Sequence, residues 1–351
     1  MSSTGNGNWK IAIVGAASLR GKELSEVLGE SVFADASFTL LDDEEALGQL
    51  EAVADEVTFI QRIEYSAFAG MDFVFFTCDP AVTRKHWKAA QKAGASVIDI
   101  SGALEGEPDV LVLAPWVSDA GEGAALHLAT PAVVTAHTAA IALSLLIKQL
   151  NELAPIRSTS ATVLEPASEA SRAAMDELHQ QTVSLLSFQS LPRAIYDAQV
   201  AFNLIPVFGE QSKVNLGVIE QRISDHCRLL LGPTLPQPAI QLISAPVFHG
   251  YTFSIYVEFA KPIQLDTVDA ALEGEFVDVV LGDQDLPSNL TASGQSEIVV
   301  RIRSGRTSAS EPGKVDAIWI WAALDNLKFS ALNAIACAQQ LRRLRPQGKV
   351  Q

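Results

Sequence analysis

The stretch WKIAIVGAASLRGKELSEVLGE, residues 9–30, decides the fold of this chain. Residues 9–14 form a short apolar run that is typical of a β-strand, and residues 23–30 have the mixed pattern of a helix. A glycine-containing turn, GAASLRG at residues 15–21, joins the two. This order of strand, glycine turn and helix opens a dinucleotide-binding unit, so we expect an N-terminal Rossmann-type domain.

The glycine turn is degenerate as a cofactor site. Gly15 and Gly21 hold the outer positions of a GxxGxxG pattern, but Ser18 takes the middle position, where glycine would let the backbone approach a pyrophosphate. Asp42 follows the next predicted strand, where an acid commonly accepts from an adenosine ribose and repels a 2′-phosphate. In the alternative interpretation, Asp42 and Asp43 simply begin a solvated loop. We expect no cofactor, with weakly bound NAD as the alternative.

Strands and helices continue to alternate through the first half. An amphipathic helix follows Cys78, with Trp87 and Ala90 on its apolar side. Such βα units predict a parallel, doubly wound sheet with ligands at the carboxyl ends of its strands. The expected strands are 38–41, 56–63, 71–77, 96–101, 110–113 and 124–129.

The stretch LATPAVVTAH, residues 128–137, is where the first half ends. We expect Pro131 at the first position of a helix that runs to about residue 150, because a proline there loses no hydrogen bond. A side chain in that first turn would feel the positive end of the helix dipole, which suits an activated nucleophile.

The second half has longer elements and predicts an α+β domain. Its strands alternate apolar and polar residues and should form a largely antiparallel sheet, and residues 304–314 read as a surface loop. The expected strands are 157–164, 239–244, 252–259, 298–302 and 317–322, and the expected helices are 168–187, 216–231 and 325–344.

Composition excludes several functions. The net charge is −16, with 25 Lys and Arg against 41 Asp and Glu, which argues against a nucleic-acid partner. The three cysteines are too few and too scattered for a zinc site or disulfides, so we expect no metal and a reducing compartment, the cytoplasm. The N-terminus lacks an apolar signal core, and the longest apolar run, residues 139–147, is too short to span a bilayer.

Six stretches together resemble aspartate-semialdehyde dehydrogenase. The resemblance implies a Rossmann domain at residues 1–130, completed by a C-terminal helix at 330–351, and an α+β domain at 131–329 that forms a homodimer. The stretches are GAASLRG (15–21), TCDPAVT (77–83), ATPAVVT (129–135), AFNLIP (201–206), PVFHGYT (246–252) and DNLKFSALNA (325–334).

The resemblance also implies where the family's catalytic residues would fall. Val133 stands at the position of the nucleophilic cysteine, and Glu165 at that of a glutamine. Ser244 replaces the arginine that holds the substrate carboxylate, and Tyr251 replaces the acid–base histidine. An isopropyl group cannot attack an aldehyde, and a phenol that titrates near pH ~10 is a poor base at neutral pH.

The positions at which the family binds its substrate and phosphate also carry residues that do not suit the role. The resemblance puts Glu105 at the position of an arginine that binds the substrate phosphate, and residues 77–80 at a phosphate-binding loop. Asp79 adds negative charge to that loop, and Pro80 removes an N–H donor. Glu220 and Arg222 match a substrate-binding pair in charge, or are solvated positions on one helix face.

Three other residues are candidates for a replacement chemistry: Cys78 at a strand end, Thr135 one turn into the expected helix, and His137 on the same helix face as Val133. None has an obvious basic partner in the sequence. The chain therefore resembles the catalytically degenerate, Usg-type paralogues of the family, and we expect a non-enzymatic dimeric scaffold or regulatory protein. The alternative is an NAD(P)-dependent oxidoreductase with altered or residual activity in amino-acid biosynthesis.

Overall fold

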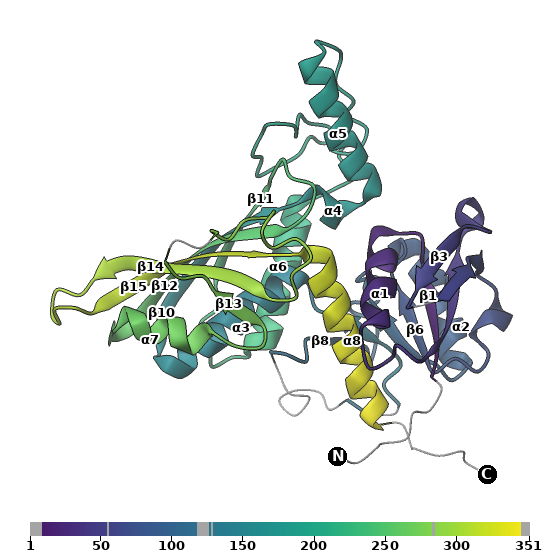
Figure 1. Ribbon diagram of the computed structural model, residues 1–351, viewed down its shortest axis with the longest axis horizontal. Helices are drawn as coiled ribbons and strands as arrows, with labels where there is room; N and C mark the ends of the chain where they lie inside the picture. Colours follow the sequence, from purple (N-terminus) through teal and green to yellow (C-terminus); the bar gives the residue numbers. More distant parts are fainter. Residues whose placement is uncertain (1–8, 55, 118–125, 128, 283–284, 345–351) are drawn as a thin grey trace. The chain divides into compact units, whose positions relative to one another are not determined.

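The computed structural model describes residues 9–54, 56–117, 126–127, 129–282 and 285–344. The chain folds into two compact units, of which the first comprises residues 1–136 and 330–351 and the second residues 137–329. Figure 1 shows both units, coloured along the sequence. Helix α8 (Asn326–Leu344) begins in the second unit and continues in the first.

The first unit is built on a parallel sheet of seven strands in the order β5-β2-β1-β6-β7-β9-β8. It has the predicted strand–turn–helix opening and confirms the expected fold class. Its strands are β1 (Lys10–Val14), β2 (Ser37–Asp42), β5 (Gln61–Arg62), β6 (Phe73–Phe76), β7 (Ser96–Asp99), β8 (Leu111–Leu113) and β9 (Val133–Thr135). Its helices are α1 (Leu19–Gly29), α2 (Pro80–Lys92) and most of α8, with short 3₁₀ turns at Glu44–Ala46 and Tyr65–Phe68.

Side chains cover both faces of this sheet. In β1, Ile11 and Ile13 pack into one apolar layer and Ala12 and Val14 into the other, since successive residues of a strand point to opposite faces. Helices α1 and α8 contribute to the first layer and helix α2, through its buried Trp87, to the second. A strand buried on both faces reads as the continuous apolar run seen in the sequence.

The glycines of the first turn are required by packing. Gly15 has φ 88°, and a Cβ there would lie 2.6 Å from Cβ and N of Cys78. A Cβ on Gly21 would lie 2.2 Å from the carbonyl oxygen of Gly15. The turn therefore lies directly against the segment that follows β6, and only glycine fits at these two positions.

Two details of the first unit differ from expectation. The predicted strand at 56–63 is two short strands, β4 (Glu56–Phe59) and β5, and β4 pairs with β3 (Leu50–Val53), which was not predicted, in a separate two-stranded sheet. The predicted strand at 124–129 lies largely outside the described residues, and residues 126, 127 and 129 are not in a strand.

The expectation of a helix starting at Pro131 was wrong. Residues 133–135, Val-Val-Thr, form strand β9 instead, because β-branched residues fit a strand better than a helix. Helix α3 (Thr138–Leu153) begins five residues after Val133 and is capped by His137, whose side chain accepts the N–H of Ala139. Val133 and Thr135 are thus strand residues, and His137 precedes the helix.

The second unit is built on a mixed sheet of six strands in the order β11-β10-β12-β15-β14-β13. The three central pairs are antiparallel and the two outer pairs are parallel. Its strands are β10 (Ile156–Glu165), β11 (Ala239–Ser244), β12 (Tyr251–Ile263), β13 (Val277–Val279), β14 (Ile298–Thr307) and β15 (Val315–Leu324). Its helices, besides the start of α8, are α3, α4 (Ala167–Ala170), α5 (Arg172–Leu186), α6 (Leu216–Leu231) and α7 (Leu265–Leu272). Strand β14 runs through Thr307, so the loop predicted at 304–314 is shorter, and neither α7 nor β13 was expected.

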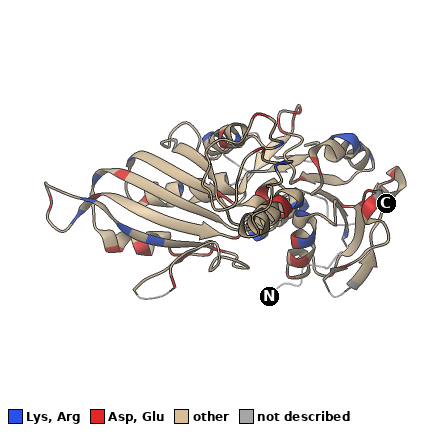
Figure 2. Cartoon of the chain, turned by 90° about the horizontal axis from the view of Figure 1, so that it is seen from above, with Lys and Arg blue, Asp and Glu red and all other residues tan. Residues whose placement is uncertain are grey.

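One face of this sheet is buried and the other is partly open. Ala161, Ile255 and Ile320 are register neighbours on the buried face. On the other face, Tyr256 lies beside Trp319, with ring centroids 4.9 Å apart. Figure 2 shows most of the length of these strands in tan, and the charged residues that they carry are of both signs, such as Arg301 and Arg303 in β14, Glu258 in β12 and Asp316 in β15.

Helices α4 and α5 and residues 187–215 form an arm of the second unit with its own small core around Leu178, Tyr196 and Ala201. The helix predicted at 168–187 is broken at Ser171, whose hydroxyl caps α5 by accepting the N–H of Ala174.

Two buried side chains of α5 form hydrogen bonds with the backbone of residues 192–201 in the arm. Gln181 donates to the carbonyls of Pro192 and Ala198 and accepts from the N–H groups of Val200 and Ala201. The carboxylate of Glu177 accepts the N–H groups of Ile195 and Tyr196 at 2.7 and 3.1 Å. These bonds satisfy loop backbone groups that would otherwise be buried without a partner.

We predict that Gly21→Ala destabilises the first unit by about 1–3 kcal/mol, since the added methyl group would overlap the carbonyl of Gly15. The control is Gly217→Ala at the exposed start of α6, where the nearest atom to a new Cβ is 3.4 Å away. There alanine should be neutral or stabilise by up to about 1 kcal/mol. Thermal unfolding of both variants tests this, and equal midpoints would contradict it.

Candidate functional site

Five amides of the glycine turn, those of Gly15, Ala16, Ala17, Ser18 and Gly21, have acceptors within the protein. The N–H of Ala17 donates to Oδ2 of Asp42 at 2.8 Å, and the N–H of Gly21 donates to the hydroxyl of Ser18 at 2.9 Å. The amides of Gly15 and Ser18 donate to carbonyl oxygens of Leu41 and Gly15. The carboxylate of Asp42 therefore occupies a donor of the turn that could otherwise bind an anionic ligand.

These residues do not fit the phosphates of NAD(P). Ser18 is the N-cap of α1, so its hydroxyl sits where a pyrophosphate would meet the start of the helix. A phosphate near Ala17 would displace Asp42 or meet its carboxylate. The next residues, Asp43 to Glu45, continue the negative charge. Only the position of Asp42 at the end of β2 remains compatible with an adenosine ribose.

The segment after β6 is also occupied by structural contacts. The hydroxyl of Thr77 donates to the carbonyls of Val14 or Gly15, and the carboxylate of Asp79 caps α2 by accepting the N–H of Ala81. Pro80 is the first residue of α2 and has no N–H. An anion at this helix start would replace the Asp79 carboxylate rather than fill a vacant position. Glu105 is half-buried within the turn that follows β7.

Cys78 begins a chain of polar side chains at the carboxyl edge of the first sheet. Its sulfur lies 3.4 Å from the hydroxyl of Thr83, which lies 3.1 Å from that of Ser101. Ser101 donates to Oδ1 of the buried Asp99 at 2.6 Å. Burial raises the pKa of the Cys78 thiol to about 12, and the charges of Asp99 and Asp42 add to the effect. The protonated thiol is a poor nucleophile at neutral pH.

The second unit brings three of the predicted positions together. Glu165 and Ser244 are the last residues of β10 and β11 and are register partners, and Tyr251 is the first residue of β12. Because β12 runs antiparallel to β10, all three lie at one end of the sheet. The Tyr251 hydroxyl donates to Oε2 of Glu165 at 3.4 Å, and the three residues are 0–8% exposed. Val133 belongs to the first unit, where its side chain is fully buried in the sheet.

A buried polar network lies beside these residues. His137 and Tyr251 have ring centroids 6.1 Å apart. The Nε2 of His137 lies 3.7 Å from a carboxylate oxygen of Glu169, whose other oxygen accepts from the amide of Asn326 at 3.1 Å. The N–H of His137 donates to Nδ1 of His226 at 2.8 Å.

The hydrogen bonds fix the tautomer of His137. Its Nδ1 accepts the N–H of Ala139, so the neutral ring carries its proton on Nε2, the atom that faces Glu169. A carboxylate and an imidazole in this arrangement can hold or transfer a proton. Sequence reasoning found His137 but placed it on a helix face, and it missed Glu169, His226 and Asn326, which come from three other elements.

The predicted pair Glu220 and Arg222 lies on α6. Oε2 of Glu220 accepts the N–H of Leu242 at 2.7 Å, so this carboxylate ties α6 to strand β11. Arg222 is half-buried.

Among residues with described positions, no three His, Cys, Asp or Glu side chains are grouped to hold a metal ion. Within the same residues, no helix is both long and apolar enough to cross a membrane.

Two family models match the chain. The model described as semialdehyde dehydrogenase, NAD binding domain, covers residues 10–124, and that described as semialdehyde dehydrogenase, dimerisation domain, covers residues 147–328. Both agree with the resemblance seen in the sequence.

Individual relatives agree as well. The chain is 31% identical over 336 residues to the USG-1 protein homolog of Pseudomonas aeruginosa, covering 94% of this chain and 97% of that protein. It is 26% identical over 339 residues to the aspartate-semialdehyde dehydrogenase of Rickettsia bellii, covering 95% and 97%. A solved structure of a probable aspartate-semialdehyde dehydrogenase from Pseudomonas aeruginosa superposes with a TM-score of 0.82 at 28% identity, covering 96% and 99%.

We predict that Cys78 reacts with a thiol reagent about a thousandfold more slowly than an exposed cysteine at pH 8, because its raised pKa lowers the thiolate fraction. Burial raises the pKa of Cys227 to about 12 and raises that of Cys337 further. The rate should rise with each pH unit up to about 12. Release of thionitrobenzoate from native and denatured protein measures this, and a fast native phase lost in Cys78→Ser would contradict it.

Proposed function

The chain belongs to the semialdehyde dehydrogenase family, and we propose that it is a homologue of aspartate-semialdehyde dehydrogenase that acts without catalysis, as a dimeric scaffold or regulatory protein. The observation that carries the proposal is the buried Tyr251–Glu165 pair at the sheet end, where the resemblance requires a histidine and a glutamine. The proposal places the protein in the cytoplasm, where its three free cysteines remain reduced.

The nucleophile is the first missing part. Val133, the position given by the sequence resemblance, is fully buried in strand β9. A nucleophile activated by the start of α3 would instead be Thr138, its first residue, whose side chain is a hydroxyl. Neither side chain provides a thiolate, and a threonine hydroxyl needs a base to attack an aldehyde.

The groups that hold and protonate a substrate are the second missing part. Ser244 has no cationic fork for a carboxylate. Glu165 would repel an anionic substrate, and it accepts a hydrogen bond from Tyr251. Losing one member of a catalytic unit removes most of its rate enhancement, and here several are changed together.

The family membership supports a homodimer. The dimerisation-domain model covers residues 147–328, which is most of the second unit. A cyclic dimer is the commonest state of soluble homo-oligomers.

The rival function is an NAD(P)-dependent oxidoreductase with altered or residual activity in amino-acid biosynthesis. One observation favours it: the His137–Glu169 pair is a buried acid–base pair close to Tyr251. This rival function requires nucleotide binding. The glycine turn opposes such binding, because the amides of Ala17 and Gly21 already donate to Asp42 and Ser18.

We predict no phosphate-dependent NADPH formation from aspartate semialdehyde by the wild-type chain, Val133→Cys or Thr138→Cys. A buried cysteine at 133 would be protonated, as Cys337 is, and a cysteine at 138 would still lack a base and a carboxylate clamp. The comparison is a quadruple variant with Thr138→Cys, Glu165→Gln, Ser244→Arg and Tyr251→His, assayed beside the single variants.

Turnover by purified wild-type protein above that of a mock preparation would overturn the inactive interpretation. If the turnover of the His137→Ala variant were at least about tenfold lower, the rival function would replace the inactive interpretation. Activity in a single cysteine variant would show that a base exists where we propose none.

We predict that NADP does not bind at micromolar concentration, because a 2′-phosphate and a pyrophosphate would meet Asp42 and Ser18. Calorimetry with NADP and NAD tests this. The variant Ser18→Gly with Asp42→Ser removes both internal ligands and should bind NADP more tightly than the wild type, by about tenfold or more. Micromolar NADP affinity in the wild type would contradict the prediction.

A further inference from the structure

Strands β3 and β4 of the first unit form a hairpin with an exposed apolar face. Leu50 lies opposite Phe59 and Ala52 lies opposite Val57, and successive residues of a strand point to opposite faces. These four residues therefore share one side of the hairpin, which we call the hairpin face. Leu50 is 58% exposed, Phe59 60% and Val57 67%, and Ala52 is also exposed.

The polarity of this hairpin is inverted. An antiparallel pair that covers a core usually has apolar residues toward the core and polar residues toward water. Here Val53 and Ile60 pack into the apolar layer of α1, but Glu51 and Thr58 lie on the same side of the hairpin as Val53. Glu51 also forms an ion pair with Lys22 of α1 at 2.6 Å, so the hairpin is anchored beside α1 (Figure 1). This anchoring does not use the hairpin face.

The stretch that contains the hairpin is strongly acidic. Residues 41–60 hold seven Asp and Glu and no Lys or Arg, although the chain has 25 Lys and Arg in all. Asp43 and Glu45 are exposed just before the hairpin. The side chain of Gln49 donates to the carbonyl of Glu45, and the carbonyl of Gln49 accepts the N–H of Ile60, so these acids are held at the base of the hairpin. The hairpin face is thus an apolar surface with negative charge beside it.

An apolar surface of this kind marks a contact site. Exposed apolar patches bordered by polar residues are typical of protein–protein interaction sites, and an uncovered apolar hairpin is also an aggregation hazard. The acids determine which partner fits, because they attract a cationic segment and repel an anionic one. For the same reason they disfavour a nucleic acid and an anionic membrane surface.

We propose that the hairpin face binds a basic amphipathic segment of a partner protein, one that presents apolar side chains flanked by Lys or Arg. The proposal rests on the scaffold or regulatory role proposed above and names the chemistry of the partner. The hairpin is already folded and anchored before the partner arrives, so little conformational entropy is lost on its side of the contact.

A second copy of this chain is a poorer occupant of the hairpin face. Its helix α2 carries no Asp or Glu within its 13 residues and presents exposed cations at Arg84, Lys85, Lys88 and Lys92. The apolar side of α2, which includes Trp87 and Ala90, is buried against its own sheet. Helix α2 therefore offers charge without the apolar side chains that the hairpin face would contact.

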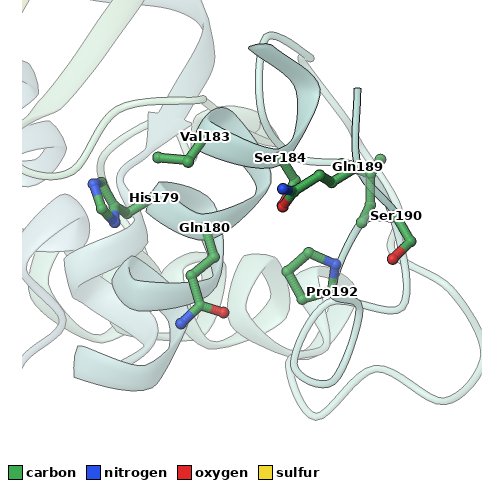
Figure 3. Close-up of a pocket in the computed structure, with 8 residues that line it drawn as sticks. His179, Gln180, Val183, Ser184, Gln189, Ser190 and Pro192 are labelled. Carbon is green, nitrogen blue, oxygen red and sulfur yellow. The ribbon is translucent and has the colours of Figure 1, made fainter. Parts of the chain in front are cut away.

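The arm presents another exposed hollow, a groove between α5 and residues 189–192 (Figure 3). In Figure 3 the labelled side chains of the helix and of the following segment border this hollow from two sides. None of the side chains that line the groove carries a permanent charge, so nothing there selects a partner by charge. The hairpin face differs from the groove because the acids beside it identify the partner.

The test uses the full chain and three fluorescent peptides of equal length, with fluorescence anisotropy as the measurement. The first peptide has Leu on one face of an amphipathic helix and Lys on the other, the second has Glu in place of Lys, and the third has Ser in place of Leu. The Leu–Lys peptide should bind at least about tenfold more tightly than either of the others, because it alone matches both the apolar face and the charge beside it.

Substitutions locate the bound peptide. Phe59→Thr should weaken binding of the Leu–Lys peptide by about tenfold or more and Val57→Thr by about threefold, because each removes apolar contact and keeps a residue that suits a strand. The matched control is Val207→Thr, which changes a valine of the arm that is 71% exposed and should leave the affinity unchanged. In the wild type, the peptide should slow amide hydrogen exchange in residues 47–60, a measurement that needs no variant to fold.

A charge variant tests the role of the acids. Asp43→Asn combined with Glu45→Gln should weaken binding at low salt and much less at high salt. Asparagine at position 43 can still accept the N–H of residue 45, as the aspartate does. The control is Glu275→Gln combined with Asp278→Asn, which removes two exposed charges from the second unit and should have no effect.

The outcomes separate the hairpin site from the proposed function. Equal affinity for the Leu–Lys and Leu–Glu peptides, equal losses in Phe59→Thr and Val207→Thr, or protection from exchange only outside residues 47–60 would each overturn the hairpin site. The peptides are added without nucleotide or semialdehyde, so the result is independent of the turnover assay. Turnover in that assay would overturn the non-catalytic role and leave a confirmed hairpin site in place, whereas failure of peptide binding would overturn the hairpin site and leave the non-catalytic role in place.

Discussion

The buried amide of Asn326 holds the polar interior of the second unit together. It is fully buried, accepts the N–H of Gly250 just before β12, and bonds to Ser168 and Glu169 in α4. Through Glu169 the same amide orients the side chain opposite His137. Since a buried amide without partners is costly, these segments must keep their relative positions for the unit to fold. The position of Glu169 opposite His137 therefore depends on satisfying one buried side chain.

The sequence predicted elements whose patterns are set locally. The apolar run before Gly15 became β1, and the periodic segment Leu216–Leu231 became α6 with the expected ends. The prediction of secondary structure failed where two local signals competed. Pro131 suggested a helix start, but Val133 to Thr135 preferred a strand. The short strand β13 pairs with β14, and its three residues carry too little pattern to be found alone.

Some residues of the candidate site could be predicted from the sequence, and others could not. Tyr251 was found because it lies in a stretch that resembles a known family, and Glu165 and Ser244 because the resemblance matches them to catalytic positions of that family. Strand pairing brought the three to one end of the sheet. His226 and Glu169 reach His137 from α6 and α4, which are distant in sequence, and no local signal marks them. Long-range partners of this kind appear only when the fold is known. The N-cap role of His137 was also hidden, because the start of α3 was placed too early.

The turn closed by Ser18 and Asp42 has a consequence for the life of the protein in a cell. A dehydrogenase gains stability from its nucleotide, about 2.7 kcal/mol when the free nucleotide is at a hundred times its dissociation constant. If the turn binds no nucleotide, as we propose, the chain draws nothing from that pool. Its steady-state level would then be independent of the supply of reduced and oxidised nucleotide, so starvation or oxidative stress would leave its abundance unchanged while a nucleotide-dependent relative turned over faster.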